Sequence, residues 1–93
     1  ISNISFMKVA VWDTYVTRND GVVMHFDIIV PDAVKDAETV YTYGRTYLKN
    51  KNLKDISLTS KECTFCHVES IRSSWKEAIE THGYYIYEME NCE

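Results

Sequence analysis

The chain of 93 residues is long enough for one domain with a buried core and too short for two. Its hydrophobic share of 45%, its charged share of 26% and its mere four glycine and proline residues exclude disordered and collagen-like chains. The net charge of −4 argues against a nucleic-acid partner, and no apolar stretch approaches the roughly 20 residues that cross a bilayer, which argues against a membrane partner.

Residues 1–6 precede Met7-Lys8-Val9, which reads like a natural start of a protein. We interpret residues 1–6 as an extension, either native or added by cloning, and residues 7–93 as a single domain. Two runs rich in β-branched and aromatic residues, 7–16 and 22–30, predict two strands. Asp20-Gly21 lies between them and predicts an antiparallel hairpin.

The register of this hairpin depends on the length of its turn. A two-residue turn sets Asp13 opposite Ile28, whereas a slip of one residue sets Asp13 opposite Asp27, which like-charge repulsion disfavours. We therefore predict the two-residue turn. Asp13 then interrupts an apolar face and needs a partner, such as Arg45 or a loop amide. The apolar members of that face would be Met7, Val9, Val11, Tyr15, Met24, Phe26, Ile28 and Val30.

A helix is predicted after the hairpin. Pro31 ends the second strand, and Asp32 or Asp36 then caps a helix that runs to about Lys49. Gly44 lies within the apolar stripe of this helix, and we interpret it as a point of close approach to a strand. The stripe repeats at spacings of three and four residues and consists of Ala37, Val40, Tyr41, Gly44, Tyr47 and Leu48.

The second half of the chain predicts two further strands around a second helix. Lys61–Glu69 has the length of a strand, and 84–89 is the final strand. Between them, Ser74 and Glu77 form a capping-box pattern at the start of a helix, and Gly83 provides its stop. The order ββαβαβ is a hairpin followed by two strand–helix–strand crossovers. It predicts an α+β fold of two layers, a mixed four-stranded sheet with two helices packed on it.

Five segments of the sequence are distinctive: MKVAVWDTYV at 7–16, DG at 20–21, HFDI at 25–28, LTSKECTFCH at 58–67 and GYYI at 83–86. In these segments the chain resembles a family of small bacterial proteins known as domain of unknown function 2024. The resemblance implies a single α/β domain. It carries no reaction, substrate or catalytic residue.

The sharpest local motif is Cys-x-x-Cys-His, from Cys63 through Cys66 to His67. Two thiols at this spacing bind a metal ion or close a redox disulfide when a turn directs both to one point. The metal or thiol candidates are therefore Cys63, Cys66, His67 and His25. A structural zinc site usually needs a second ligand pair, which this sequence lacks, and in a regular strand Cys63 and Cys66 point to opposite faces. We favour structural thiols and no cofactor, with zinc as the alternative.

The cysteines also bear on the cellular compartment. The sequence has three of them, an odd count, and no secretory segment. This pattern predicts reduced thiols and a cytoplasmic location.

His25 and Asp27 lie two residues apart in the second strand and therefore share one face. In the predicted register Trp12 and Thr14 lie beside them. An imidazole next to a carboxylate is a minimal general-base pair, and an aromatic floor suits a small ligand. The candidate ligand-binding residues are thus Trp12, Thr14, His25 and Asp27. The alternative is an ordinary half-exposed polar face or a subunit contact.

Aromatic residues make up 13% of the chain, including seven tyrosines, and not all of them fit inside so small a core. Because tyrosine and tryptophan are enriched at protein interfaces, a homodimer is expected. No phosphate-binding glycine loop, serine elbow or metalloprotease helix is present in the sequence. We therefore favour a non-enzymatic protein that self-associates or binds a partner. The alternatives are a metal- or thiol-dependent protein that uses the Cys-x-x-Cys-His segment and a small-molecule enzyme.

Overall fold

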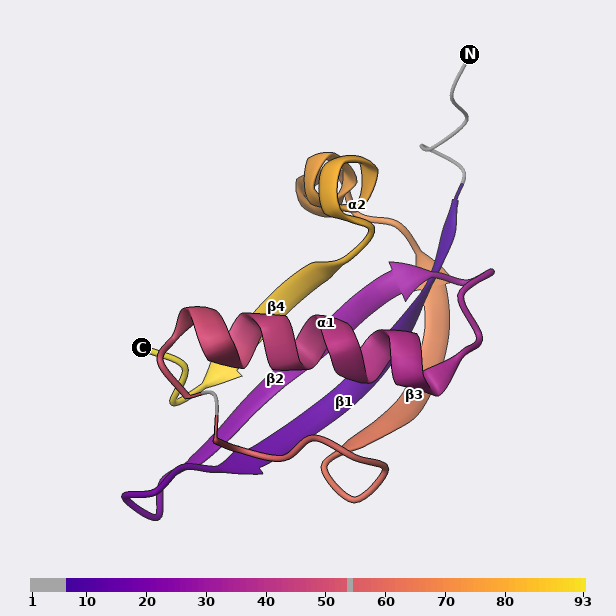
Figure 1. Ribbon diagram of the computed structural model, residues 1–93. Helices are drawn as coiled ribbons and strands as arrows, with labels where there is room; N and C mark the ends of the chain where they lie inside the picture. Colours follow the sequence, from indigo (N-terminus) through magenta and orange to yellow (C-terminus); the bar gives the residue numbers. More distant parts are fainter. Residues whose placement is uncertain (1–6, 54) are drawn as a thin grey trace.

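The computed structural model describes residues 7–53 and 55–93, so the proposed extension at residues 1–6 lies outside the described residues. A four-stranded sheet carries one long helix across a face and a short helix at one end (Figure 1). The observed order is ββαβαβ, as predicted. The elements are β1 (Lys8–Thr17), β2 (Val23–Pro31), α1 (Ala37–Asn50), β3 (Cys63–Ser70), the 3-10 helix η2 (Ser73–Trp75), α2 (Lys76–His82) and β4 (Tyr85–Glu90).

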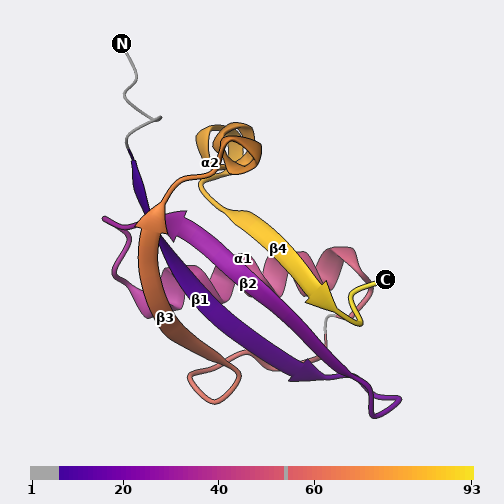
Figure 2. The same cartoon turned by 180° about the vertical axis from the view of Figure 1, so that it is seen from behind.

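The strands lie in the order β3-β1-β2-β4, and every neighbouring pair is antiparallel. The prediction of a mixed sheet is therefore wrong. The crossover through α1 connects β2 to β3, which run in the same direction, but β1 lies between them. The crossover through α2 then carries the chain across the whole sheet to β4, beside β2 (Figure 2). No described helix is long and apolar enough to span a membrane.

The hairpin has a three-residue turn, so the predicted register is wrong by one position. The amide of Arg18 donates to the carbonyl of Val22 at 2.9 Å, and Gly21 adopts a left-handed conformation with φ of 87°. A turn of this length closed by a left-handed glycine is one of the common hairpin types. Asp20 Oδ1 also accepts the Val22 amide at 3.1 Å, which supports the longer turn. As a result Asp13 lies opposite Asp27.

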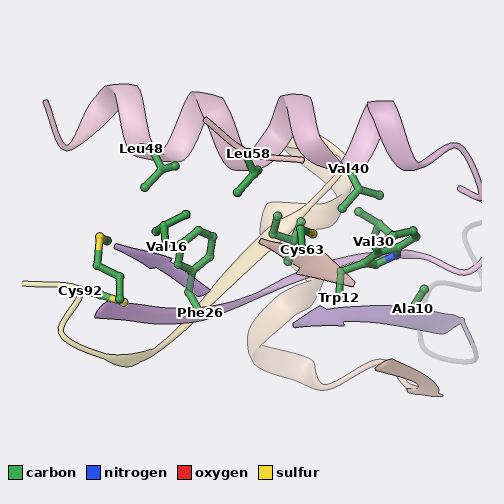
Figure 3. Close-up of a cluster of buried hydrophobic side chains, with 12 residues drawn as sticks. Ala10, Trp12, Val16, Phe26, Val30, Val40, Leu48, Leu58, Cys63 and Cys92 are labelled. Atoms are coloured by element: carbon green, nitrogen blue, oxygen red, sulfur yellow. The ribbon is translucent and has the colours of Figure 1, made fainter. Parts of the chain in front are cut away.

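The shift of one residue exchanges the two faces of β1. Its even-numbered side chains, not its odd-numbered ones, point to the α1 side together with the even-numbered side chains of β2. Val40 and Leu48 point from α1 toward this face, and Phe26 lies among them (Figure 3). Full burial of one side chain the size of Phe26 contributes about 1.5–3 kcal/mol. The buried members of this core are Ala10, Trp12, Val16, Met24, Phe26, Ile28, Val30, Val40, Leu48, Leu58, Cys63 and Cys92.

Gly44 brings α1 close to the sheet, as predicted. A Cβ atom at this position would lie 2.9 Å from Cδ1 of Ile28 on β2, and it would lie still closer to the side chain of Leu58. Cys92, near the C-terminus, closes the other end of the same core, where its thiol donates to the carbonyl of His25 at 3.3 Å.

The opposite face of the sheet is covered at one end only. Trp75 and Ile79 pack there on a smaller cluster of Val9, Val11, Ile29 and Ile71. The predicted capping box at Ser74 and Glu77 is not formed, because α2 begins at Lys76 after η2 and no side chain caps it. The predicted stop at Gly83 is confirmed by its φ of 89°. Beyond this cluster the face carries polar side chains.

Candidate functional site

The uncovered part of this face carries two carboxyl groups and an imidazole from the two central strands. Asp13 on β1 is directly opposite Asp27 on β2, and Tyr15 is opposite His25. The side chains of His25 and Asp27 are 12% and 14% exposed, and that of Asp13 is 35% exposed. The site is therefore a half-buried polar cluster on the two central strands of the sheet.

The three side chains converge on one point. Nε2 of His25 lies 3.0 Å from Oδ1 of Asp13 and 3.8 Å from Oδ1 of Asp27. One ligand atom from each residue falls within 4.8 Å of the other two. Among the described residues, Oδ1 of Asp27 is buried and has no hydrogen-bond partner. This oxygen is therefore a buried acceptor that receives no hydrogen bond from the described residues.

The two carboxyl groups interact closely enough for each to shift the pKa of the other, in opposite directions. Burial raises the pKa of Asp27 to about 7, and the neighbouring Asp13 carboxylate adds to this increase. The pKa of Asp13 is lowered, because Asp27 and then His25 donate hydrogen bonds to its charged form. Below about pH 7, Asp27 is mostly protonated and Asp13 carries the charge.

The imidazole of His25 is held from two sides. The ring of Tyr15 stacks on it at a centroid distance of 4.0 Å and an interplanar angle of 12°. Oε1 of Glu90 on β4 lies 4.0 Å from Nδ1. The ring is thus placed with Nδ1 toward Glu90 and Nε2 toward the two carboxyl groups. Desolvation raises the pKa of Tyr15, and the nearby charges of Asp13 and Asp27 add to the effect.

A β-bulge in β3 adds a thiol and a second imidazole next to the cluster. Val11 pairs with His67 and Trp12 pairs with Phe65, so Cys66 is the extra residue between them. Sγ of Cys66 lies 3.1 Å from Nδ1 of His67. Desolvation raises the pKa of Cys66, and the negative charges of the two aspartates raise it further, so Cys66 is a thiol at neutral pH.

The structure brings together only part of the predicted metal or thiol set. Cys66 and His67 are neighbours, and His25 lies on the same face of the sheet. Cys63 is buried in the core on the α1 side, and Cys66 is exposed. The two thiols of the motif therefore point to opposite faces, as strand alternation predicted, and they do not form a joint site.

The predicted grouping of Trp12 and Thr14 with His25 and Asp27 is also wrong. Trp12 and Thr14 are opposite Ile28 and Phe26 and point toward α1, whereas His25 and Asp27 point to the other face. The error follows from the register, which moves every side chain of β1 to the other face. Thr14 is fully buried, and Trp12 is 9% exposed.

Sequence reasoning missed Asp13 as a member of the site. It assigned the partner of this carboxylate to Arg45 or a loop amide, but Asp13 is paired with His25. Arg45 binds Glu38 and the carbonyl of Leu58 instead. The available signal was the parity of Asp13 and Asp27, which share a face whenever the turn has an odd number of residues.

Comparison with known proteins identifies relatives of this chain. A family model described as "Domain of unknown function (DUF2024)" matches residues 7–89. The solved NMR structure of protein NE1680 from Nitrosomonas europaea, a structural genomics target, is similar with 40% sequence identity and a TM-score of 0.82. The match covers 94% of this chain and 100% of NE1680. Among curated proteins there is no significant match. The chain therefore belongs to the DUF2024 family, as the resemblance in its sequence indicated.

Proposed function

We propose that this protein binds a divalent transition-metal ion through Asp13, His25 and Asp27. The observation that carries the proposal is the direct opposition of two carboxyl groups beside an imidazole nitrogen, with one buried carboxylate oxygen left without a donor. Like charges directly opposite each other destabilise a sheet, yet the three-residue turn enforces this pairing. A cation between the carboxylates removes the repulsion that protonation of Asp27 now relieves.

The distances suit such an ion. Bonds of about 2.0–2.2 Å to nitrogen and oxygen place the ligands of a four-coordinate ion about 3–4 Å apart. Nε2 of His25 lies 3.0 Å and 3.8 Å from the two carboxylate oxygens. Three protein ligands leave one coordination position for water or a small molecule. One imidazole with two carboxylates suits Zn²⁺, Fe²⁺ or Mn²⁺ better than Mg²⁺ or Ca²⁺.

The surroundings of His25 support the same role. A metal-binding histidine usually directs its other ring nitrogen to a carboxylate or carbonyl, which fixes the tautomer and the orientation of the ring. Oε1 of Glu90 lies at 4.0 Å from Nδ1 and is the candidate for this partner. The stacked ring of Tyr15 restricts rotation of the imidazole.

The sequence suggested a metal-dependent protein that uses the Cys-x-x-Cys-His segment, and this proposal assigns the metal to other residues. Its ligands come from β1 and β2, and the Cys66–His67 pair is a neighbour, not a ligand pair. A reducing cytoplasmic location remains part of the proposal, and the three free cysteines agree with it. The open coordination position leaves room for a small-molecule reaction, so the enzyme alternative depends on what occupies that position.

The test is metal titration of chelator-treated protein under reducing conditions, with isothermal calorimetry for affinity and native mass spectrometry for stoichiometry. We expect one Zn²⁺ per chain, weaker binding of Mn²⁺ and no measurable binding of Mg²⁺. Asp27→Asn keeps the shape of the side chain, and it should weaken Zn²⁺ binding at least about tenfold. Asp32→Asn is the matched control and should bind as the wild type does.

A second variant separates this site from the thiol motif. Cys66→Ser should leave Zn²⁺ affinity unchanged if the ligands are the two aspartates and His25. Loss of binding in Cys66→Ser with normal binding in Asp27→Asn would overturn the proposal in favour of the thiol. Binding of less than one ion per chain at saturating Zn²⁺ would overturn it altogether.

A further inference from the structure

The outer edge of β3 is exposed to an unusual degree. β3 lies at one border of the sheet, and within the described residues it pairs with β1 alone (Figure 2). Every side chain from Thr64 to Val68 is exposed, on both faces of the strand. Two of them are large and apolar, with Phe65 53% and Val68 49% exposed. An edge of this kind is suited to pair with another strand.

The other border of the sheet is protected against such pairing. β4 carries Glu88 and Glu90, both exposed, and no basic residue. Two copies of β4 side by side would bring like charges together, which disfavours pairing. β3 differs because its one acidic residue, Glu69, lies 2.7 Å from the Nε2 atom of His67 in the same strand, so opposite charges alternate along this edge.

The backbone direction of β3 limits the possible registers. The amide of Ile71 donates to the carbonyl of Met7, immediately before β1, so the backbone polar groups of Ile71 point inward, toward β1. Backbone groups alternate along a strand, and those of Ser70 and Val68 therefore point outward. A strand added at this edge must form its hydrogen-bonded pairs at these two outward positions.

We propose that β3 pairs antiparallel with β3 of a second copy of this chain, about a two-fold axis at Val68. The outward backbone groups of Val68 then bond those of Val68 of the partner subunit. In this register His67 lies opposite Glu69 of the partner subunit, and the reverse pair follows by symmetry. The interface is self-complementary in charge, and the two sheets join into one of eight strands.

Neighbouring registers do not have this complementarity. An axis at Ser70 sets Glu69 opposite Ile71 of the partner subunit, so no ion pair forms between the subunits and each Glu69 keeps His67 and Arg72 of its own chain as its partners. An axis at Cys66 falls on the β-bulge, where the ladder is irregular. The register at Val68 thus satisfies the backbone direction and the charges together. This surface is independent of the proposed metal ligands, which lie on the two central strands.

The first test is the mass of the wild-type protein by light scattering and sedimentation from micromolar to near-millimolar concentration. We expect a concentration-dependent dimer. Val68→Lys sets two ammonium groups opposite each other across the axis and should give a monomer over the same range. Val23→Lys makes the same change at an exposed valine of β2 and should still dimerise. A wild-type monomer at every concentration, or a dimer unaffected by Val68→Lys, would overturn the proposal.

The second test reads the register directly in a Cys66→Ser background. Residues in a hydrogen-bonded antiparallel pair have Cα atoms about 5.5 Å apart, which is within the range of a disulfide. Val68→Cys should therefore form a covalent dimer with oxidised glutathione, which is reduced as the two thiols are oxidised. Ser70→Cys is the control, because four residues of offset separate it from its symmetry mate by about 13 Å. Equal cross-linking of both variants would refute the register.

Discussion

Asp13 and Asp27 lie directly opposite each other on the two central strands, and their carboxyl groups shift each other's pKa in opposite directions. Such a pair holds one proton at a pH at which exposed aspartates hold none. The stability of the sheet therefore depends on pH, and the open face of the sheet carries ionisable groups.

The pair predicts how stability depends on pH in metal-free protein. Folding raises the pKa of Asp27 from 3.8 to about 7, so its stabilising contribution is lost as pH rises through 7. Folding lowers the pKa of Asp13, so its contribution is lost as pH falls below its ordinary value of 3.8. The contribution of the pair to the unfolding free energy should therefore be greatest near pH 4 and should fall progressively between about pH 4 and pH 7.

Asp27→Asn tests this assignment because the amide is neutral at every pH. In urea unfolding with chelator present, the unfolding free energy of the wild type should decrease between pH 6 and pH 8.5. The decrease for the variant should be smaller by about 1 kcal/mol. Asp32→Asn should follow the wild type. The same loss in Asp27→Asn as in wild type would show that the proton on Asp27 does not control stability.

Thiol reactivity should distinguish the three cysteines. Cys66 is exposed, whereas Cys63 and Cys92 are buried, so native protein should react with a thiol-specific disulfide reagent at one position and unfolded protein at three. Desolvation raises the pKa of Cys66, and the charges of Asp13 and Asp27 raise it further, so Asp27→Asn should increase the rate at pH 8, where wild-type Asp27 is charged. Rapid reaction of two thiols in native protein would contradict the burial of Cys63.

The turn should be sensitive to one glycine. Gly21 adopts a positive φ of 87°, and a Cβ atom there would meet nothing within 4 Å, so Gly21→Ala tests backbone conformation alone. We expect a loss of about 1–2 kcal/mol in unfolding free energy. Asn19→Ala, in the same turn, should change stability by roughly 0.5 kcal/mol or less. Equal effects of the two substitutions would argue against the left-handed turn.

Gly44→Ala should destabilise the protein although alanine favours helices. Its Cβ atom would overlap the packed side chains of Leu58 and Ile28 in the core. Overpacking costs about 1–3 kcal/mol, which the gain of about 1 kcal/mol in helix propensity offsets only in part. Thr46→Ala, at an exposed position of α1, should be neutral or stabilising in thermal unfolding. A more stable Gly44→Ala would show that α1 has room to move away from the sheet.

The elements and their order were predictable because each has a local signal, such as Gly83 for the helix end. The register of the hairpin was not, because Asp20-Gly21 fits turns of two and of three residues. His25 and Asp27 could be placed on one face at once, since both lie on the same strand. Asp13 belongs to the other strand, so its role depended on a turn length that the local sequence leaves open.

Like-charge repulsion was the argument against the true register, and it failed for a physical reason. Burial and the Asp13 charge raise the pKa of Asp27 to about 7, so below that pH the repulsion between the two carboxyl groups is largely removed. The three-residue turn and the α1 core, which receives Trp12 and Phe26, outweigh what remains. A rule that treats every aspartate as charged therefore fails where burial raises the pKa of one member of a carboxyl pair.

The place of Cys92 in the core bears on how the protein folds during synthesis. The core beneath α1 takes its members from residue 10 through to residue 92. Most contacts that close it join segments distant in the sequence, a topology that folds slowly compared with helical bundles. The nascent chain therefore completes this core only after residue 92 has left the ribosome, although α1 and Leu58, which pack on the same face, are synthesised earlier.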